Sequence, residues 1–288
     1  ERLVVVPPDP WPGDSLRGRE LLVGVFRFAG HTISKEELSW HPTCARPEWI
    51  ADLHGFEWLR DLRSVGGDRA RRMAREMVAS WLDLYPKYDD TAWRADITGV
   101  RLASWITFHD FFCVSADEEF QRKYFESLAR QAQYLFKALP GSYKGIALMK
   151  ALKGLAFTGI ALEEGQGRLE KAFRLILKEI HVQVHPDGSH ISRSPQVTFE
   201  FLKTLVDLRA ALISARLEVP DDLQYAIDRM APAVKFFRHA DGTLAHFNGA
   251  QEGNPHLIDT TLMHSGARGK AADELPHGGY QRLQSGRS

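Results

Sequence analysis

Seven long amphipathic patterns follow one another along this chain, and they constrain its fold more than any other feature. In each pattern, apolar residues recur at intervals of three and four, which is typical of a helix with one buried face. The patterns cover residues 68–84, 92–112, 117–138, 144–162, 167–184, 195–217 and 221–238. Successive helices of similar length with short connections pack in antiparallel pairs, as a bundle, a solenoid or a closed ring of hairpins. The sequence therefore predicts an all-α fold whose loops gather on two rims.

The N-terminal region differs from this regular part. Residues 21–33 have the composition of a strand or an extended strap, and the prolines at positions 8, 10 and 12 argue against a helix before them. Further on, Ser115 and Glu118 have the spacing of a capping box and predict the start of the third long helix. We expect an N-terminal strap over 1–45, a helical domain over 46–265, and a linker or the start of another domain over 266–288.

Composition excludes several classes of function. Lys and Arg total 37, as do Asp and Glu, so no broad basic field favours nucleic acid. No apolar run is long enough for a membrane-spanning helix, and the sequence has no dinucleotide fingerprint, P-loop or serine-hydrolase elbow. We therefore predict no cofactor.

The chain begins without Met and ends in polar sequence, so we expect it to be part of a longer one. The compartment stays open, with the periplasm or cell envelope favoured over the cytoplasm.

Two loops with Asp-Gly turns contain many of the side chains that could bind a ligand or transfer a proton. The first, PDGSHISRSP, places His190, Arg193 and Ser194 between two predicted helices. An Arg in such a turn binds a carboxylate or phosphate in two-pronged geometry, whereas the alternative is that Arg193 and Ser194 only cap the next helix. The second loop, HADGTLAHFNGAQEG, contributes the aromatic Phe247 and the polar Asn248, Gln251 and Glu252. The three polar side chains suit sugar hydroxyls or proton transfer as well as a solvated loop.

Zinc binding is the weaker interpretation of the histidines before the first loop. His181 and His185 have HxxxH spacing, with His190 close enough to be a third ligand, but no Glu follows His181. Polar residues at a helix end account for this pair more simply, so we predict no metal site.

Aromatic residues in the first third of the chain offer another candidate surface. Trp58 and Trp105 lie near predicted helix ends, with His54 and Arg101 close in sequence. Tryptophan rings either line carbohydrate clefts or fill helix–helix cores, and for these two both alternatives stay open.

Several of these segments resemble motifs of the heparinase II/III-like polysaccharide lyases, in the right order and over most of residues 20–283. The run PEWIADLHGFEWLRDL is similar to their W-x-YNLHYFDYL segment, and WRADITGVRLASWI to their R-x-x-N-W helix. The two Asp-Gly loops resemble their DGS and PDG loops. The resemblance implies an incomplete (α/α) toroid, followed in the complete protein by a C-terminal β-sandwich that this chain lacks, its first strand beginning near Tyr280.

The resemblance also implies an activity, the β-elimination of uronic-acid-containing glycans by general acid–base chemistry. The chain departs from the family at two usual catalytic positions, with Val197-Thr198 in place of Tyr-His and Ile146-Ala147 in place of Asn-His. We therefore expect either a lyase that uses other groups, a glycan-binding toroid without activity, or a helical scaffold for protein partners. The candidate catalytic residues are His190, Arg193 and Tyr280. The candidate substrate-binding residues, expected to border one cleft, are His54, Trp58, Arg101, Trp105, Ser194, Phe247, Asn248 and Glu252.

Overall fold

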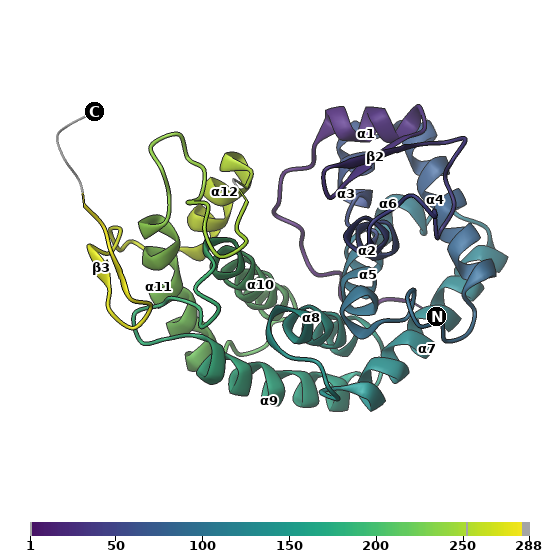
Figure 1. The fold of residues 1–288 in the computed structure, drawn as a ribbon. Helices are drawn as coiled ribbons and strands as arrows, with labels where there is room; N and C mark the ends of the chain where they lie inside the picture. Colours follow the sequence, from purple (N-terminus) through teal and green to yellow (C-terminus); the bar gives the residue numbers. More distant parts are fainter. Residues whose placement is uncertain (1, 252, 284–288) are drawn as a thin grey trace. The chain divides into compact units, whose positions relative to one another are not determined.

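The computed structural model describes residues 2–251 and 253–283, and this part of the chain is mostly helical (Figure 1). The all-α prediction is confirmed: the described strands form only two-stranded antiparallel pairs. The seven amphipathic patterns correspond to α4 (Gly67–Leu84), α5 (Ala95–Thr107) with α6 (His109–Phe112), α7 (Glu118–Ala138), α8 (Gly145–Ala161), α9 (Gln166–Gln183), α10 (Pro195–Ser214) and α11 (Asp221–Phe236).

Two local predictions about helix ends had different outcomes. Ser194 caps α10 as predicted, its side chain accepting a hydrogen bond from Val197 N, with Pro195 at the first helical position. The capping box at Ser115 is wrong, because Asp117 caps α7 by accepting from Phe120 N at 2.8 Å. The Ser115 hydroxyl instead accepts a hydrogen bond from Arg75.

The N-terminal region contains a helix that the sequence argument excluded. Helix α1 (Ser15–Leu22) precedes a hairpin of β1 (Val25–Phe28) and β2 (His31–Ser34). The prolines block a helix only where they lie, and all three precede Asp14, whose carboxylate accepts hydrogen bonds from the first turn of α1. Helices α2 (Pro47–Gly55) and α3 (Leu59–Val65) follow, separated by Phe56 in left-handed conformation.

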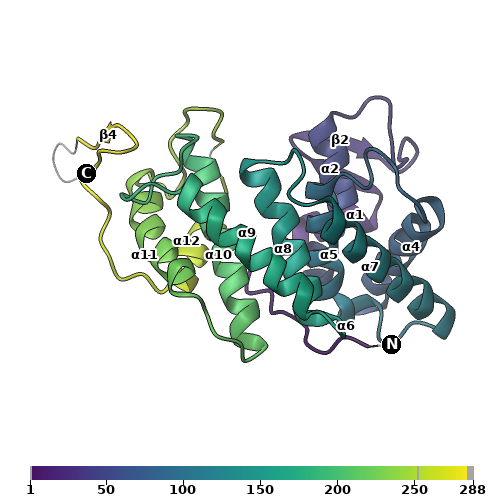
Figure 2. The ribbon, with the colours of Figure 1, turned by 90° about the horizontal axis from the view of Figure 1, so that it is seen from below.

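The described residues form two compact units that divide between Phe173 and Arg174, inside α9. The division into strap, helical domain and linker stays a prediction. In the first unit α5 packs against α8, and the two helices approach each other at Gly99 and Gly154, which have no side chains. A Cβ atom on Gly154 would lie 2.4 Å from the Cα of Gly99, so only glycine allows the two backbones to approach this closely. Figure 2 shows α8, α5 and α7 as neighbours in this unit.

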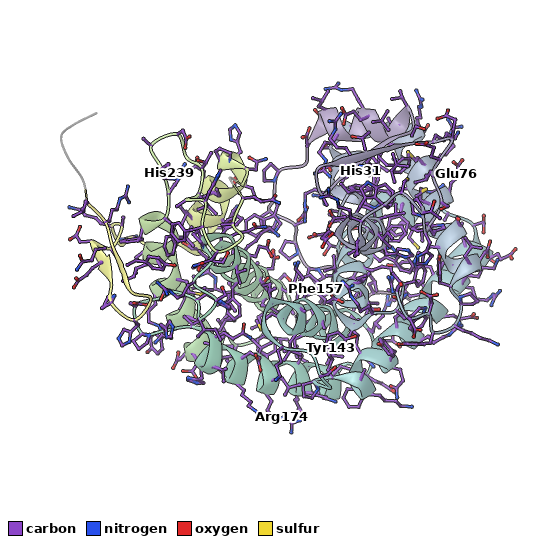
Figure 3. The ribbon with its side chains drawn as sticks, in the orientation of Figure 1. His31, Glu76, Tyr143, Phe157, Arg174 and His239 are labelled. Atoms are coloured by element: carbon purple, nitrogen blue, oxygen red, sulfur yellow. The ribbon has the colours of Figure 1, made fainter. Side chains whose placement is uncertain are left out.

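The second unit packs α10 against α11 and α12 (Pro255–Ser265). The chain then reaches a short hairpin of β3 (Glu274–Leu275) and β4 (Tyr280–Gln281). That this segment begins a β-sandwich stays a prediction. The two Asp-Gly turns follow α9 and α11, the second one beginning at His239 (Figure 3). Among the described residues, no helix is both long and apolar enough to cross a membrane.

Candidate functional site

Three loops of the second unit meet at the backbone carbonyl of Arg193. This oxygen accepts a hydrogen bond from the Tyr280 hydroxyl at 2.8 Å and another from the Asn248 amide at 2.7 Å. The same amide nitrogen lies 3.1 Å from the Tyr280 hydroxyl. Residues separated by up to 87 positions are therefore tied to one acceptor, and the structure brings together three of the predicted site residues.

Aromatic rings complete this group. The guanidinium of Arg193 lies over the Tyr280 ring at 5.0 Å, and the Phe247 ring lies 5.2 Å from that of Tyr280. Arg193 and Asn248 are exposed, while Phe247 and Tyr280 are partly exposed. We call Arg193, Phe247, Asn248 and Tyr280 the Arg193 cluster. It presents a cation, an amide and ring faces to solvent, a combination that suits an acidic sugar.

His190 precedes Arg193 in the same loop and is 3 % exposed. Its Nδ1 accepts a hydrogen bond from Ser192 N at 3.1 Å, so its Nε2–H donates to Gln183 Oε1 at 2.9 Å. Burial, with a smaller effect of His185, lowers the pKa of His190 to about 4. The imidazole is therefore neutral near pH 7, but both nitrogens have protein partners. A catalytic role for it stays a prediction.

Two further predicted residues of this unit are Ser194 and Glu252. The Ser194 side chain is buried and caps α10, as the simpler alternative held. Its role in substrate binding stays a prediction. Glu252 lies outside the described residues.

Asp187 holds the loops together, a role that sequence analysis missed. One carboxylate oxygen accepts from the backbone N and hydroxyl of Ser189 at 3.0 and 2.6 Å. The other accepts from the backbone N–H groups of His277 and Gly278 at 2.7 and 3.1 Å. Burial acts to raise the pKa of Asp187, but these hydrogen bonds outweigh it and leave the pKa below its ordinary value. The Asp-Gly turn drew attention to Asp187, but no sequence pattern predicted its hydrogen-bond partners at least 90 positions away.

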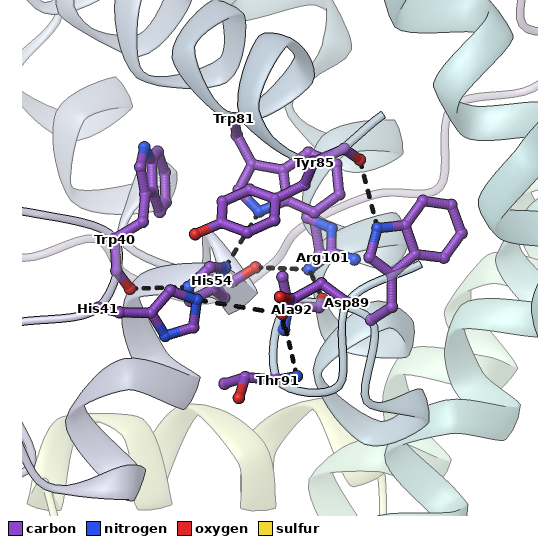
Figure 4. A network of polar contacts seen from close by, with 10 residues as sticks. Trp40, His41, His54, Trp81, Tyr85, Asp89, Thr91, Ala92 and Arg101 are labelled. Carbon is purple, nitrogen blue, oxygen red and sulfur yellow. Dashed lines mark hydrogen bonds and ion pairs between the residues drawn. The ribbon is translucent and has the colours of Figure 1, made fainter. Parts of the chain in front are cut away.

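The remaining four predicted residues lie in the core of the first unit. Figure 4 shows two of them, His54 and Arg101. Arg101 is fully buried and stacks on Trp81, with its Cζ 4.0 Å from the ring centroid. Its donors reach four oxygen atoms, those of Gln131 Oε1 (2.8 Å), Ala92 O (2.8 Å), His54 O (3.1 Å) and Thr98 Oγ1 (3.2 Å). Arg101 thus ties α2, α5, α7 and the turn before α5 together.

His54 belongs to the same buried network. Its Nδ1 accepts from Trp81 Nε1 at 3.1 Å, so its Nε2–H donates to Trp40 O at 2.9 Å. Burial, followed by the charge of Arg101, lowers the pKa of His54 to about 3. The imidazole is therefore a neutral structural bridge.

Trp58 and Trp105 fill the core beside this network. Trp58 donates to Leu53 O at 3.0 Å, and the ring of Phe56 lies between the two tryptophans, 5.0 and 5.3 Å from them. All four predicted residues are at most 2 % exposed. Their direct contact with a substrate stays a prediction that would require this core to open. That the residues of the two units border one cleft also stays a prediction.

The histidines considered for zinc have other contacts. His181 Nε2 lies 3.3 Å from Asp222 Oδ2, and the His185 ring stacks on that of His277 at 6.2 Å. Within the described part of the chain, no three His, Cys, Asp or Glu side chains are grouped to hold a metal ion.

A curated protein is similar to this chain over nearly all of its length. FtsZ-localized protein C of Caulobacter vibrioides (strain NA1000 / CB15N) is 29% identical over 295 residues, which cover 99% of this chain and 50% of that protein. The chain therefore spans about half the length of this curated relative.

Two solved structures show the same fold. A crystal structure of heparinase III is 17% identical, with a TM-score of 0.67 over 83% of this chain and 39% of that one. The heparan sulfate lyase HepC from Pedobacter heparinus is 18% identical, with a TM-score of 0.61 over 80% of this chain and 39% of that one. The predicted toroid-type helical fold is thereby confirmed.

The sequence comparison gives the family directly. The family described as heparinase II/III N-terminus matches residues 22–265, which confirms the resemblance stated from the motifs. Since this match covers most of its length, the chain belongs to the heparinase II/III family and corresponds to that family's N-terminal domain.

Proposed function

We propose that this polysaccharide-lyase-like domain binds a uronic-acid-containing glycan through the Arg193 cluster. The observation that carries the proposal is the exposed guanidinium of Arg193, supported on the Tyr280 ring beside the Asn248 amide. Within the described residues, no carboxylate lies within ion-pair distance of this guanidinium. It is therefore available to the carboxylate of a ligand, which it matches in two-pronged geometry.

The neighbouring groups suit the rest of a sugar ring. Phe247 and Tyr280 are partly exposed aromatic side chains, and aromatic rings pack well against the C–H groups of a pyranose. Asn248 is exposed, and its side-chain oxygen accepts hydrogen bonds from sugar hydroxyls. Because Tyr280 and Asn248 are already fixed on the Arg193 carbonyl, binding costs little further ordering of these side chains.

The geometry supports binding more strongly than cleavage by this chain. Two of the three candidate catalytic residues have engaged side chains, the His190 nitrogens with Gln183 and Ser192 and the Tyr280 hydroxyl with the Arg193 carbonyl. Cleavage by β-elimination is the second candidate, favoured by the family and by a neutral His190 in the same loop. A protein-partner role is the third, favoured by the relative whose name describes it as FtsZ-localized.

Calorimetric titration of this chain with tetragalacturonate tests the proposal. We expect binding, and a loss of at least about tenfold in affinity for Arg193→Gln, since a charged hydrogen-bonded pair contributes about 1.5–3 kcal/mol. Arg216→Gln is a matched control, because Arg216 is also exposed, in the same unit and in left-handed conformation. Equal loss in both variants, or no binding by the unaltered chain, would refute the proposal.

The same samples decide between binding and cleavage. Ultraviolet absorbance of an unsaturated uronate product would appear only if the chain cleaves its ligand. Binding without this absorbance supports the binding function, whereas turnover abolished in Tyr280→Phe makes the lyase the function of this chain.

A further inference from the structure

We propose that His41, Tyr85 and Asp89 in the first unit form a second binding site, which takes an uncharged sugar ring. This site shares no residue with the Arg193 cluster and was not singled out by the sequence. Its three side chains come from the segment before α2 and from the turn between α4 and α5, and they surround His54 (Figure 4).

Tyr85 supplies a hydroxyl that lacks a partner. Its ring packs on Trp81 and His54 at centroid distances of 5.4 and 5.3 Å, and its edge meets His41 at 5.9 Å. Among the described residues no group lies within hydrogen-bond distance of its hydroxyl. Burial, with a smaller effect of Asp89, raises the pKa of Tyr85 to about 12, so the hydroxyl keeps its proton at neutral pH and serves as a donor.

Asp89 supplies an acceptor in a fixed orientation. Its Oδ1 accepts from the backbone N–H groups of Thr91 and Ala92 at 3.0 and 2.7 Å. These bonds lock the carboxylate, and its Oδ2 has no hydrogen-bond partner in the described part of the chain. The side chain is 39% exposed, so Oδ2 is open to a ligand.

His41 lies beside both of these groups. Its Nε2 is 4.0 Å from Asp89 Oδ1, and its ring is 5.1 Å from that of His54. The side chain is 40% exposed and makes no hydrogen bond within the described residues. An imidazole nitrogen offers either a donor or an acceptor, so this side chain adapts to either direction of a ligand hydroxyl.

The buried network beneath holds this site in place. Arg101 donates to Ala92 O, at the end of the turn that carries Asp89, and to His54 O. The Tyr85 backbone is held from both sides, by its own N–H donating to Trp81 O and by Trp93 Nε1 donating to its carbonyl at 3.3 Å. Tyr85 and Asp89 are therefore preorganised, which reduces the entropy cost of binding.

The chemistry favours a sugar ring without charge. A fixed carboxylate acceptor, a phenol donor and an imidazole beside an aromatic ring match neighbouring hydroxyl groups on a pyranose. The carboxylate of Asp89 repels an anionic group placed at Oδ2, whether uronate, sulfate or phosphate. This preference is opposite to that of the Arg193 cluster, so the two sites select different sugars.

Calorimetric titration of this chain with cellotetraose, chitotetraose, mannotetraose and tetragalacturonate tests the site. We expect at least one neutral tetrasaccharide to bind, with affinity reduced about three- to tenfold in Tyr85→Phe and at least about tenfold in Asp89→Asn. Phe keeps the packing of the ring, and Asn keeps an acceptor for Thr91 and Ala92. Tyr225→Phe is the control, since Tyr225 is 59% exposed on α11.

Two results would overturn the inference: none of the three neutral tetrasaccharides binds, or Tyr85→Phe and Tyr225→Phe bind them equally well. The Arg193→Gln variant separates this inference from the proposed function. It should weaken only tetragalacturonate binding, so each site can fail without the other.

Discussion

Two arginines of this chain have opposite environments, although the sequence marked both as candidate ligand-binding residues. Arg101 is fully buried, and its guanidinium reaches four oxygens of the protein and one tryptophan ring. Arg193 is exposed, and its guanidinium lies on one ring with no ion-pair partner among the described residues. The same side chain therefore holds a core together in one unit and is available to a ligand in the other. Three changes test this contrast.

The largest effect is expected for Arg101→Met. The change leaves the carbonyls of His54 and Ala92 and the Gln131 side chain without their donor in a buried site, which should reduce the free energy of unfolding by about 3–5 kcal/mol. Urea denaturation of this variant and of Arg216→Met, an exposed control, measures the difference. A loss below about 1 kcal/mol would show that Arg101 is dispensable for the core.

A smaller effect is expected on acidification. The folded state holds the pKa of His54 at about 3, below its ordinary value of 6.5. The stability that depends on neutral His54 is thus complete above pH 6.5 and is lost as the pH falls toward 3. The loss should reach about 2 kcal/mol by pH 5 for this histidine alone.

Unfolding curves from pH 7.5 to pH 5 measure this effect. His54→Gln should flatten the pH dependence, while His239→Gln, at an exposed position, should leave it unchanged. Equal slopes in the unaltered chain and His54→Gln would contradict the assigned protonation state.

The smallest effect is expected for Tyr280→Phe in the Arg193 cluster. The change removes the hydroxyl that donates to the Arg193 carbonyl and accepts from the Asn248 amide, but it keeps the ring under the guanidinium. We expect at most about 1 kcal/mol of lost stability and about threefold weaker binding of tetragalacturonate. Calorimetry and urea denaturation, with Tyr225→Phe as control, measure both. A large loss of stability would mean that this cluster is a core element like Arg101.

Periodic patterns predicted the helical part of the fold closely, because the spacing of apolar residues records which side of a helix is buried. The break at Phe108 between α5 and α6 left no mark in this spacing, and neither did the short helix α1. Both depend on capping and packing contacts that periodicity does not record.

The sequence could name Arg193, Asn248 and Tyr280 as candidates from their residue types and loops, but it could not predict the hydrogen bonds that join them across 55 and 87 positions. The same holds for residues whose role depends on partners far apart along the chain. Arg101 gains its role from residues 47 and 30 positions away, and Asp187 from residues at least 90 positions away. The pattern of a helix indicates a buried face, but whether a polar side chain on it meets solvent or protein depends on these distant partners.

The acceptor that joins the three loops of the second unit is a backbone carbonyl, and this has a consequence for altering the protein. A carbonyl is present whatever side chain occupies position 193, so the anchor for Tyr280 and Asn248 survives replacement of Arg193. Position 193 is thus a site at which a library of side chains can be screened for new ligand preferences on an unchanged frame. Asn and Gly suit its left-handed backbone best and give the neutral reference for such a screen.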